Sequence, residues 1–152
     1  MINLAVVYNK FNVFVEDLAN KIHDLFGSPT GDILKLMLVN SPAPVATNSV
    51  KADLTEIAAG NGYTAGGNTV SSNGTRATGT VTLDGDQIVW TAAGGSIGPF
   101  RYAVLYNDTP VTPADPLVSW WDYGSALTLL DGETFTVKFN NVVTDGTIFT
   151  LT

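Results

Sequence analysis

Apolar residues recur at helical spacing in one stretch near the start of the chain. From Phe11 onward they follow one another at steps of three and four residues: Phe14, Val15, Leu18, Ile22, Leu25 and Phe26. The opposite face is polar and includes His23, which we therefore expect in solvent. Asn9 is a suitable N-cap, and Gly27 ends the pattern. The spacing predicts one amphipathic helix over residues 9–27.

The rest of the chain has the short apolar runs that are typical of β-strands. Residues 33–39 are mostly apolar on both faces, as in a buried central strand. Residues 134–139 alternate between apolar and polar side chains, which indicates a half-buried strand. Further strands are predicted at residues 75–83, 87–92, 100–106, 117–123, 126–130 and 147–151, and one short helical turn at residues 52–57.

Turn residues separate the predicted strands. Asp84-Gly85-Asp86 predicts a tight hairpin turn, and Gly124 is expected to end the strand at residues 117–123. Residues 41–48, which contain two prolines, and residues 60–68, which are rich in glycine, predict loops. Long loops in compact domains are often functional or make contacts.

Strands spaced by about ten residues, with turn chemistry between them, predict an antiparallel β-sandwich or jelly-roll-like fold. The fold class is therefore expected to be mainly β, with one N-terminal α-helix. No internal repeat or domain boundary is evident. We predict a single domain over residues 1–152, with an N-terminal extension (1–7), a helix (9–27) and a β-sandwich (33–152).

Composition then excludes several classes of protein. Charged residues make up 14% of the 152 residues, against roughly 25% in ordinary soluble domains, and the net charge is −7. A hydrophobic content of 45% excludes a disordered chain, and the acidic balance argues against nucleic-acid binding. The absence of cysteine excludes a disulfide scaffold and a thiolate metal site. A surface so poor in charge is typical of proteins that assemble.

The sequence offers little catalytic chemistry. A single histidine cannot form a multi-histidine metal centre, and no G-x-S-x-G motif accompanies it. The glycine-rich loops lack the Lys-Ser/Thr of a phosphate-binding loop. Most of the aspartates stand in predicted turns, where Asp bonds its own backbone. We expect a protein that is not an enzyme, with no catalytic residue, cofactor or metal site.

The sequence also gives no signal for targeting or membrane insertion. Residues 2–7 are apolar but lack a preceding basic region and a cleavage site. The longest apolar run, residues 33–39, is far too short to span a bilayer. We expect synthesis in a cytoplasm and no membrane partner.

Aromatic residues cluster in Trp120-Trp121-Asp122-Tyr123. Neighbours in a strand point to opposite faces, so one tryptophan is expected inside and the other outside. The outer one has three possible roles: packing against the core or the helix, anchoring a subunit interface, or stacking on a sugar ring. Tyr63, in the glycine-rich loop, is a further predicted interface residue.

Several segments resemble small structural proteins of tailed bacteriophages. They are Tyr8-Asn9-Lys10-Phe11-Asn12 with the following Phe14–Ala19, then Lys51–Thr64, Gly94–Asp108 and Asp131–Val137. Together they cover most of the chain from Tyr8 onward and keep the expected order. The departure from the pattern is the apolar extension before Tyr8.

The resemblance implies a capsid cement, or head decoration, protein. Such a protein is expected to form a homotrimer on the outer capsid surface and to clamp neighbouring major capsid subunits, so its location is the virion. In this interpretation the interface residues are Ile2, Leu4, Val6, Tyr63, Trp120, Trp121 and Tyr123. The alternative is a tail-fibre or receptor-binding module that recognises host glycans.

Overall fold

The computed structural model describes residues 7–26, 31–139 and 145–152. The helical elements are α1 (Val13–Ala19) and the 3-10 turn η1 (Lys51–Asp53). The strands are β1 (Val7–Lys10), β2 (Leu34–Val39), β3 (Asn68–Val70), β4 (Ser72–Ala77), β5 (Thr80–Asp86), β6 (Ile88–Thr91), β7 (Ile97–Asn107), β8 (Leu117–Leu129), β9 (Thr134–Val137) and β10 (Asp145–Leu151).

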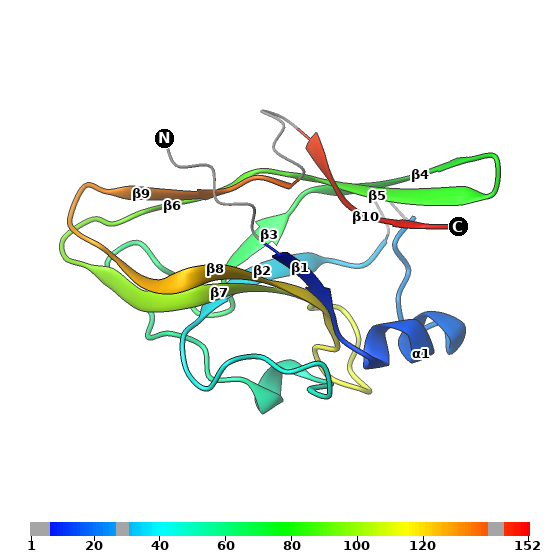
Figure 1. Ribbon diagram of the computed structural model, residues 1–152, viewed down its shortest axis with the longest axis horizontal. Coiled ribbons are helices and arrows are strands. Elements are labelled where there is room, and N and C mark those ends of the chain that lie inside the picture. Colours follow the sequence, from blue (N-terminus) through cyan, green and yellow to red (C-terminus); the bar gives the residue numbers. More distant parts are fainter. Residues whose placement is uncertain (1–6, 27–30, 140–144) are drawn as a thin grey trace.

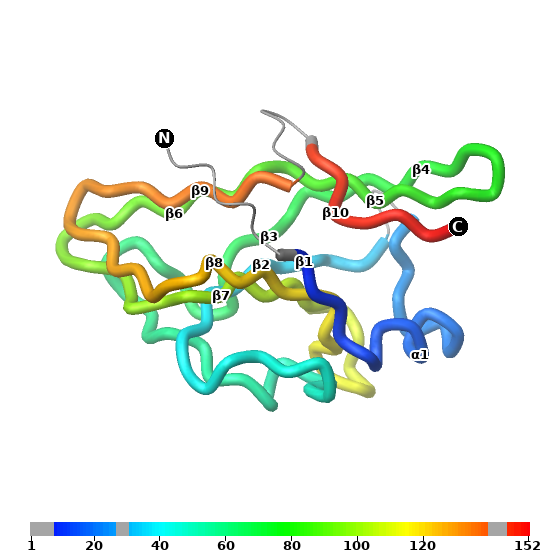
Figure 2. Tube along the Cα trace, viewed as in Figure 1, coloured from blue at the N-terminus to red at the C-terminus, as the bar shows by residue number. Residues whose placement is uncertain are grey.

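These strands form two facing layers of antiparallel sheet (Figure 1). The first layer is a five-stranded sheet in the order β1-β8-β7-β2-β3. The second layer consists of the sheet β10-β5-β4 and the pair β6-β9. Figure 2 shows α1 at one end of the layers, the end at which β10 finishes. The predicted fold class, mainly β and antiparallel with one α-helix, is confirmed.

The main core fills the space between the two layers. Leu36 and Leu38 of β2 face this space, where they belong to one buried cluster with Leu83, Trp90 and Phe149 of the second layer. Because side chains alternate along a strand, the residues between them face the other way. The five-stranded sheet therefore needs a cover on its outer face as well.

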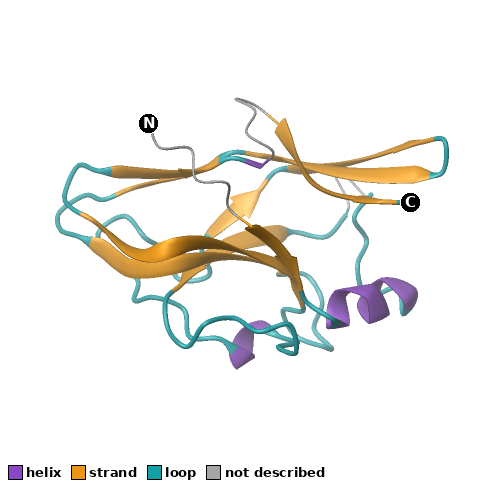
Figure 3. Ribbon diagram, in the orientation of Figure 1, coloured by secondary structure: helices purple, strands orange, loops and turns teal. Residues whose placement is uncertain are grey.

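A second core lies on that outer face. Met37 of β2 and Tyr106 of β7 join Trp120 of β8 in a separate buried cluster, against which Ala46 and Leu54 from the loops pack. Figure 3 shows these loops and η1 below the five-stranded sheet. Strand β2, which lies beside the central strand β7, is thus buried on both faces except at Lys35, as its mostly apolar character predicts.

The β4–β5 hairpin turns six residues earlier than the sequence suggests. Thr78 and Gly79 both have positive φ, at 49° and 83°, and connect the paired residues Ala77 and Thr80. This is the geometry of a two-residue type I′ turn. The prediction of a turn at Asp84-Gly85-Asp86 was wrong, because this segment lies within β5.

Gly85 has a packing role in that strand. A Cβ at this position would lie 2.8 Å from the side chains of Ile148 and Val70. The glycine therefore allows the strand to approach its neighbours closely, which a sequence pattern does not separate from a turn.

Gly124 does not end its strand either. β8 continues through it to Leu129 and is irregular there: Tyr102 pairs with Asp122, but Phe100 pairs with Leu127. The extra β8 residues form a bulge in which Gly124 adopts a φ of 94° and donates its N–H to Asp122 at 2.7 Å. A bulge with a left-handed glycine looks locally like a turn.

The helix is shorter than predicted. α1 begins after the N-cap Asn12, not Asn9, and ends at Ala19. Lys21 has a φ of 61°, and its N–H bonds the carbonyl of Leu18, while the N–H of Ile22 bonds that of Asp17. This pair of bonds is a Schellman motif, which terminates the helix without glycine. Leu25, beyond the helix, packs against the main core from an irregular segment instead.

The glycines at positive φ give a direct test of the fold. A Cβ at Gly67 would lie 1.9 Å from the Leu36 carbonyl oxygen, whereas a Cβ at Gly79 meets nothing within 4 Å. Gly79→Ala is expected to cost about 1 kcal/mol of backbone strain. Gly67→Ala is expected to cost about 3 kcal/mol or more, because strain and steric overlap add.

Urea unfolding with an unchanged m-value would measure both free energies. Equal losses for the two variants would contradict the close contact between Gly67 and β2.

Candidate functional site

Tyr63 is a core residue. Its hydroxyl accepts the N–H of Leu38 at 3.0 Å and donates to the Glu56 carboxylate at 2.7 Å. The ring is buried beside Trp90. Burial raises the pKa of the Tyr63 hydroxyl. Little of Tyr63 is therefore exposed for the predicted interface role, because its loop folds inward and its hydroxyl accepts the buried Leu38 N–H.

Trp120 and Trp121 lie on opposite faces of β8, as strand alternation predicts. Trp120 is 9% exposed and packs on Phe11, with ring centroids 4.4 Å apart. Trp121 is partly buried between Tyr8 at 5.7 Å and Phe139 at 5.4 Å. Most of the surface of this pair is therefore used inside the chain.

Tyr123, the remaining aromatic residue of this group, is half-buried on the bulge of β8. Its ring lies edge-on to Phe135, with centroids 5.9 Å apart. The other predicted interface residues, Ile2, Leu4 and Val6, lie outside the described residues.

His23 is buried, contrary to the prediction of a solvated helical residue. The helix ends before it, and its side chain is 0% exposed. Its Nδ1 lies 2.9 Å from the Asn107 amide nitrogen, and its Nε2 lies 3.9 Å from Asp17. Asp17 is buried as well, although it belongs to the polar face of the predicted helix.

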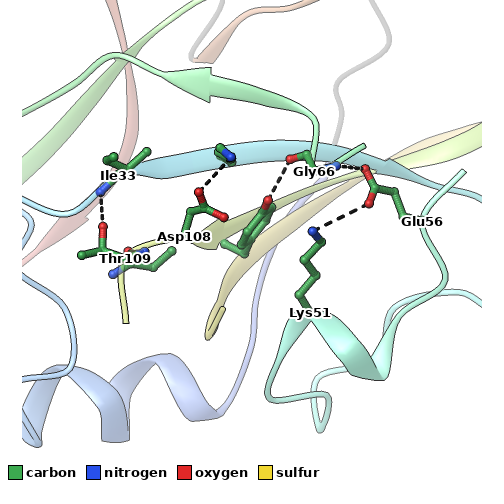
Figure 4. A network of polar contacts seen from close by, with 9 residues as sticks. Ile33, Lys51, Glu56, Gly66, Asp108 and Thr109 are labelled. Carbon is green, nitrogen blue, oxygen red and sulfur yellow. Dashed lines mark hydrogen bonds and ion pairs between the residues drawn. The ribbon is translucent and has the colours of Figure 1, made fainter. Parts of the chain in front are cut away.

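A polar network fastens the glycine-rich loop to the outer face of the five-stranded sheet (Figure 4). The Tyr106 hydroxyl donates to the Gly66 carbonyl at 2.8 Å, and the Gly66 N–H donates to Glu56 at 2.6 Å. Lys51 lies 3.8 Å from Glu56 and 4.9 Å from the centre of the Tyr106 ring. These contacts satisfy a loop backbone that no strand pairs.

Several charged side chains form ion pairs within the chain. Lys35 binds Asp108 at 2.8 Å, at the edge of the same network. Arg101 makes a two-pronged contact with Asp122 at 2.7 and 2.8 Å. These hydrogen bonds hold the pKa of the Asp122 carboxyl below its ordinary value. With Lys51, three of the seven basic residues pair within the described chain.

Two exposed valines lie on the loops that cover the five-stranded sheet. We call residues 41–56 and 108–116 together the loop face. Hydrogen bonds join its two segments: Lys51 N–H to the Asp115 carbonyl at 2.9 Å, and an isolated bridge between Val50 and Pro116. Val45 and Val111 project from it, 51% and 85% exposed.

Sequence reasoning missed these valines because it searched for aromatic anchors. Their signal is local: Val45 follows Pro44, and Val111 stands in Thr109-Pro110-Val111-Thr112-Pro113. Proline-rich loop segments hold an apolar side chain outside regular structure, where it has little opportunity to pack.

The described ranges contain no group of three or more His, Cys, Asp or Glu residues placed to hold a metal ion. Within the same ranges, no helix is long and apolar enough to cross a membrane. Comparisons with protein-family models, with curated proteins and with solved structures each found no match.

The role of Tyr63 can be tested by removing its hydroxyl. Tyr63→Phe leaves the buried Leu38 N–H without an acceptor, so we expect a loss of about 1–3 kcal/mol in the free energy of unfolding. Tyr106→Phe removes only a donor to the Gly66 carbonyl, and we expect a loss nearer to about 1 kcal/mol. Denaturant unfolding measures the free energy of unfolding of both variants. An unchanged free energy in Tyr63→Phe would contradict the hydrogen bonds of the Tyr63 hydroxyl.

Proposed function

We propose that this chain is a capsid cement protein of a tailed bacteriophage, without enzymatic activity. In this proposal it binds as a homotrimer to the outer surface of the major capsid protein lattice and stabilises the head. The observation that carries the proposal is the loop face, which exposes two valines and whose Lys51, Glu56 and Asp108 are paired within the chain. Such a surface suits contact with protein, because few charges lose hydration on binding.

The sequence segments that resemble phage structural proteins support the same proposal. Two of them, Lys51–Thr64 and Gly94–Asp108, meet in the structure: Glu56 of the first binds the Gly66 N–H, and Tyr106 of the second binds the Gly66 carbonyl. The resemblance thus falls on Lys51 and Glu56 of the loop face and on residues that hold the glycine-rich loop. It is not confined to a generic strand pattern.

The architecture supports a mechanical role. The long strands β7 and β8 form the centre of a sheet that is packed on both faces, which limits bending. A cement protein resists the internal pressure of packed DNA by bridging capsid subunits. Each contact can be weak, because many copies repeat over the lattice.

The glycan-binding alternative receives less support from the geometry. A sugar ring stacks on an open aromatic face, and Trp120 offers none because Phe11 covers it. Trp121 is enclosed on two sides by Tyr8 and Phe139. A sugar-binding assay with Trp121→Ala would test this alternative directly.

The location of the protein decides between the two functions. A cryo-EM reconstruction of the intact particle is expected to show the chain on the capsid surface at a copy number set by the lattice. Density confined to the tail tip would refute the proposal.

Binding should depend on the loop-face valines. We expect Val45→Asp and Val111→Asp each to reduce occupancy on purified capsids about tenfold, since burying a valine contributes roughly 1.5 kcal/mol. Val89→Asp is the matched control, because Val89 is 43% exposed but lies on β6 in the other layer. Co-sedimentation with capsids measures occupancy, and equal losses for all three variants would reject the loop face.

The proposed trimer makes a separate prediction. Light scattering after size-exclusion chromatography is expected to give three times the 16.0 kDa mass of one chain. A monomer at all concentrations would remove the homotrimer from the proposal, while leaving capsid binding to be judged by sedimentation.

A further inference from the structure

Asn107 joins three parts of the chain at the end of β7. It is fully buried, and its amide nitrogen donates to Nδ1 of His23 at 2.9 Å and to the Asp32 carboxylate at 2.5 Å. Its amide oxygen accepts the N–H of Thr109 at 3.1 Å. The donors and the acceptor of the amide are thus all used, and they tie His23 and Asp32 to the end of the strand.

The partners determine how the amide is oriented. An ionised carboxylate only accepts hydrogen bonds, and a backbone N–H only donates. The amide nitrogen must therefore face Asp32, and the amide oxygen must face Thr109. It follows that Nδ1 of His23 accepts a hydrogen bond, so the imidazole is neutral and carries its proton on Nε2.

Protonation of His23 conflicts with this arrangement. An imidazolium has N–H donors at both nitrogens, so two donors would face each other at 2.9 Å. Rotating the Asn107 amide to accept from Nδ1 would place its oxygen against Asp32 and its nitrogen against the Thr109 N–H. One hydrogen bond would form and two would be lost.

The carboxylates around His23 act in the opposite sense. Asp17 of α1 faces Nε2 at 3.9 Å, with Glu16 beside it on the helix, and Asp32 and Asp24 lie before β2. On the β7 side the nearest charged residue in sequence is Asp108, which is paired with Lys35. These negative charges favour an imidazolium, but the ring is enclosed and packs on Phe14 at 5.3 Å.

Burial is the larger effect. It lowers the pKa of His23 to about 4, although Asp32 raises it in part. The unfolded chain therefore binds a proton on His23 that the native chain does not bind, between pH 6.5 and about 4. The stability that neutral His23 contributes is present above pH 6.5 and is lost as the pH falls to about 4.

Asp17 has the opposite pH dependence. Burial raises the pKa of its carboxyl, so protonation on acidification relieves a cost in the native state. The pH dependence of the free energy of unfolding would therefore combine the effects of His23 and Asp17. A measurement on His23 itself is needed.

We propose that the His23–Asn107–Asp32 contact is an acid-operated latch, in which protonation of His23 releases His23 and Asp32 from Asn107 at the end of β7 while the β-sandwich stays folded. Asp24 and Asp32 also bond each other: the Asp32 N–H donates to the Asp24 carbonyl at 3.0 Å, and the Asp24 N–H donates to the Asp32 carboxylate at 2.7 Å. None of these bonds belongs to the sheet ladders, so the sheets do not need to open.

The single histidine of the chain makes the test direct. NMR of the full chain would follow the imidazole signals against pH together with amide hydrogen exchange. We expect His23 to titrate below pH 5, and the amides of Asp24, Asp32 and Thr109 to lose protection over the same range. The β2–β7 ladder should stay protected. A midpoint near 6.5, unchanged protection of the three amides, or simultaneous loss in the ladder would each overturn the latch.

A variant tests the cause. Asn107→Asp replaces the donor that faces Nδ1 with an acceptor, so we expect the His23 midpoint to rise by at least one pH unit. Asn61→Asp adds the same charge at an exposed residue whose side chain contacts Ser96, away from the cluster, and should leave the midpoint unchanged. An unchanged midpoint in Asn107→Asp, or equal shifts in both variants, would refute the mechanism. If Asn107→Asp does not fold, the wild-type titration decides.

Discussion

The whole structure depends on burying both faces of the five-stranded sheet. Its inner strands β2 and β7 carry apolar side chains on both faces, so one face needs the second β-layer and the other needs a cover of loops. Without the loops, Met37 and Val104 on the outer face would lie in water. Ala46 and Leu54 of the loop face pack against this outer cluster, so part of the loop cover belongs to the core.

Covering a sheet with loops creates a demand for hydrogen bonds, because loop backbone has no ladder to satisfy it. In the glycine-rich loop, Glu56 and Tyr106 bind the backbone of Gly66, and the hydroxyl of Tyr63 accepts the N–H of Leu38. The same contacts place the charge of Glu56 against Lys51 and the Gly66 N–H. The loop face that results exposes two valines and pairs Lys51, Glu56 and Asp108 within the chain, and the proposed binding to a capsid rests on this surface.

Much of the fold could be predicted from residue spacing. The strand at residues 33–39 and the alternation at Phe135 and Val137 follow from periods that any antiparallel sheet imposes. The errors share one cause. Gly85 and Gly124 look like turn residues, but close approach to Ile148 and a bulge in β8 explain them, and both depend on neighbours distant in sequence. The candidate site was harder: Tyr63 and His23 are polar-tipped residues whose burial depends on partners such as Leu38 and Asn107.

The sequence by itself determined the class of the protein: mainly β, low in charge, and lacking the cysteines and histidines of common metal centres. These properties follow from the composition and from the spacing of apolar residues, neither of which depends on tertiary contacts. Only the tertiary structure decided where the helix ends, which aromatic residues are buried and which valines are exposed. The physical reason is that burial is a property of pairs of segments: His23 has the spacing of a solvated residue, and Asn107, 84 positions away, places it in the interior.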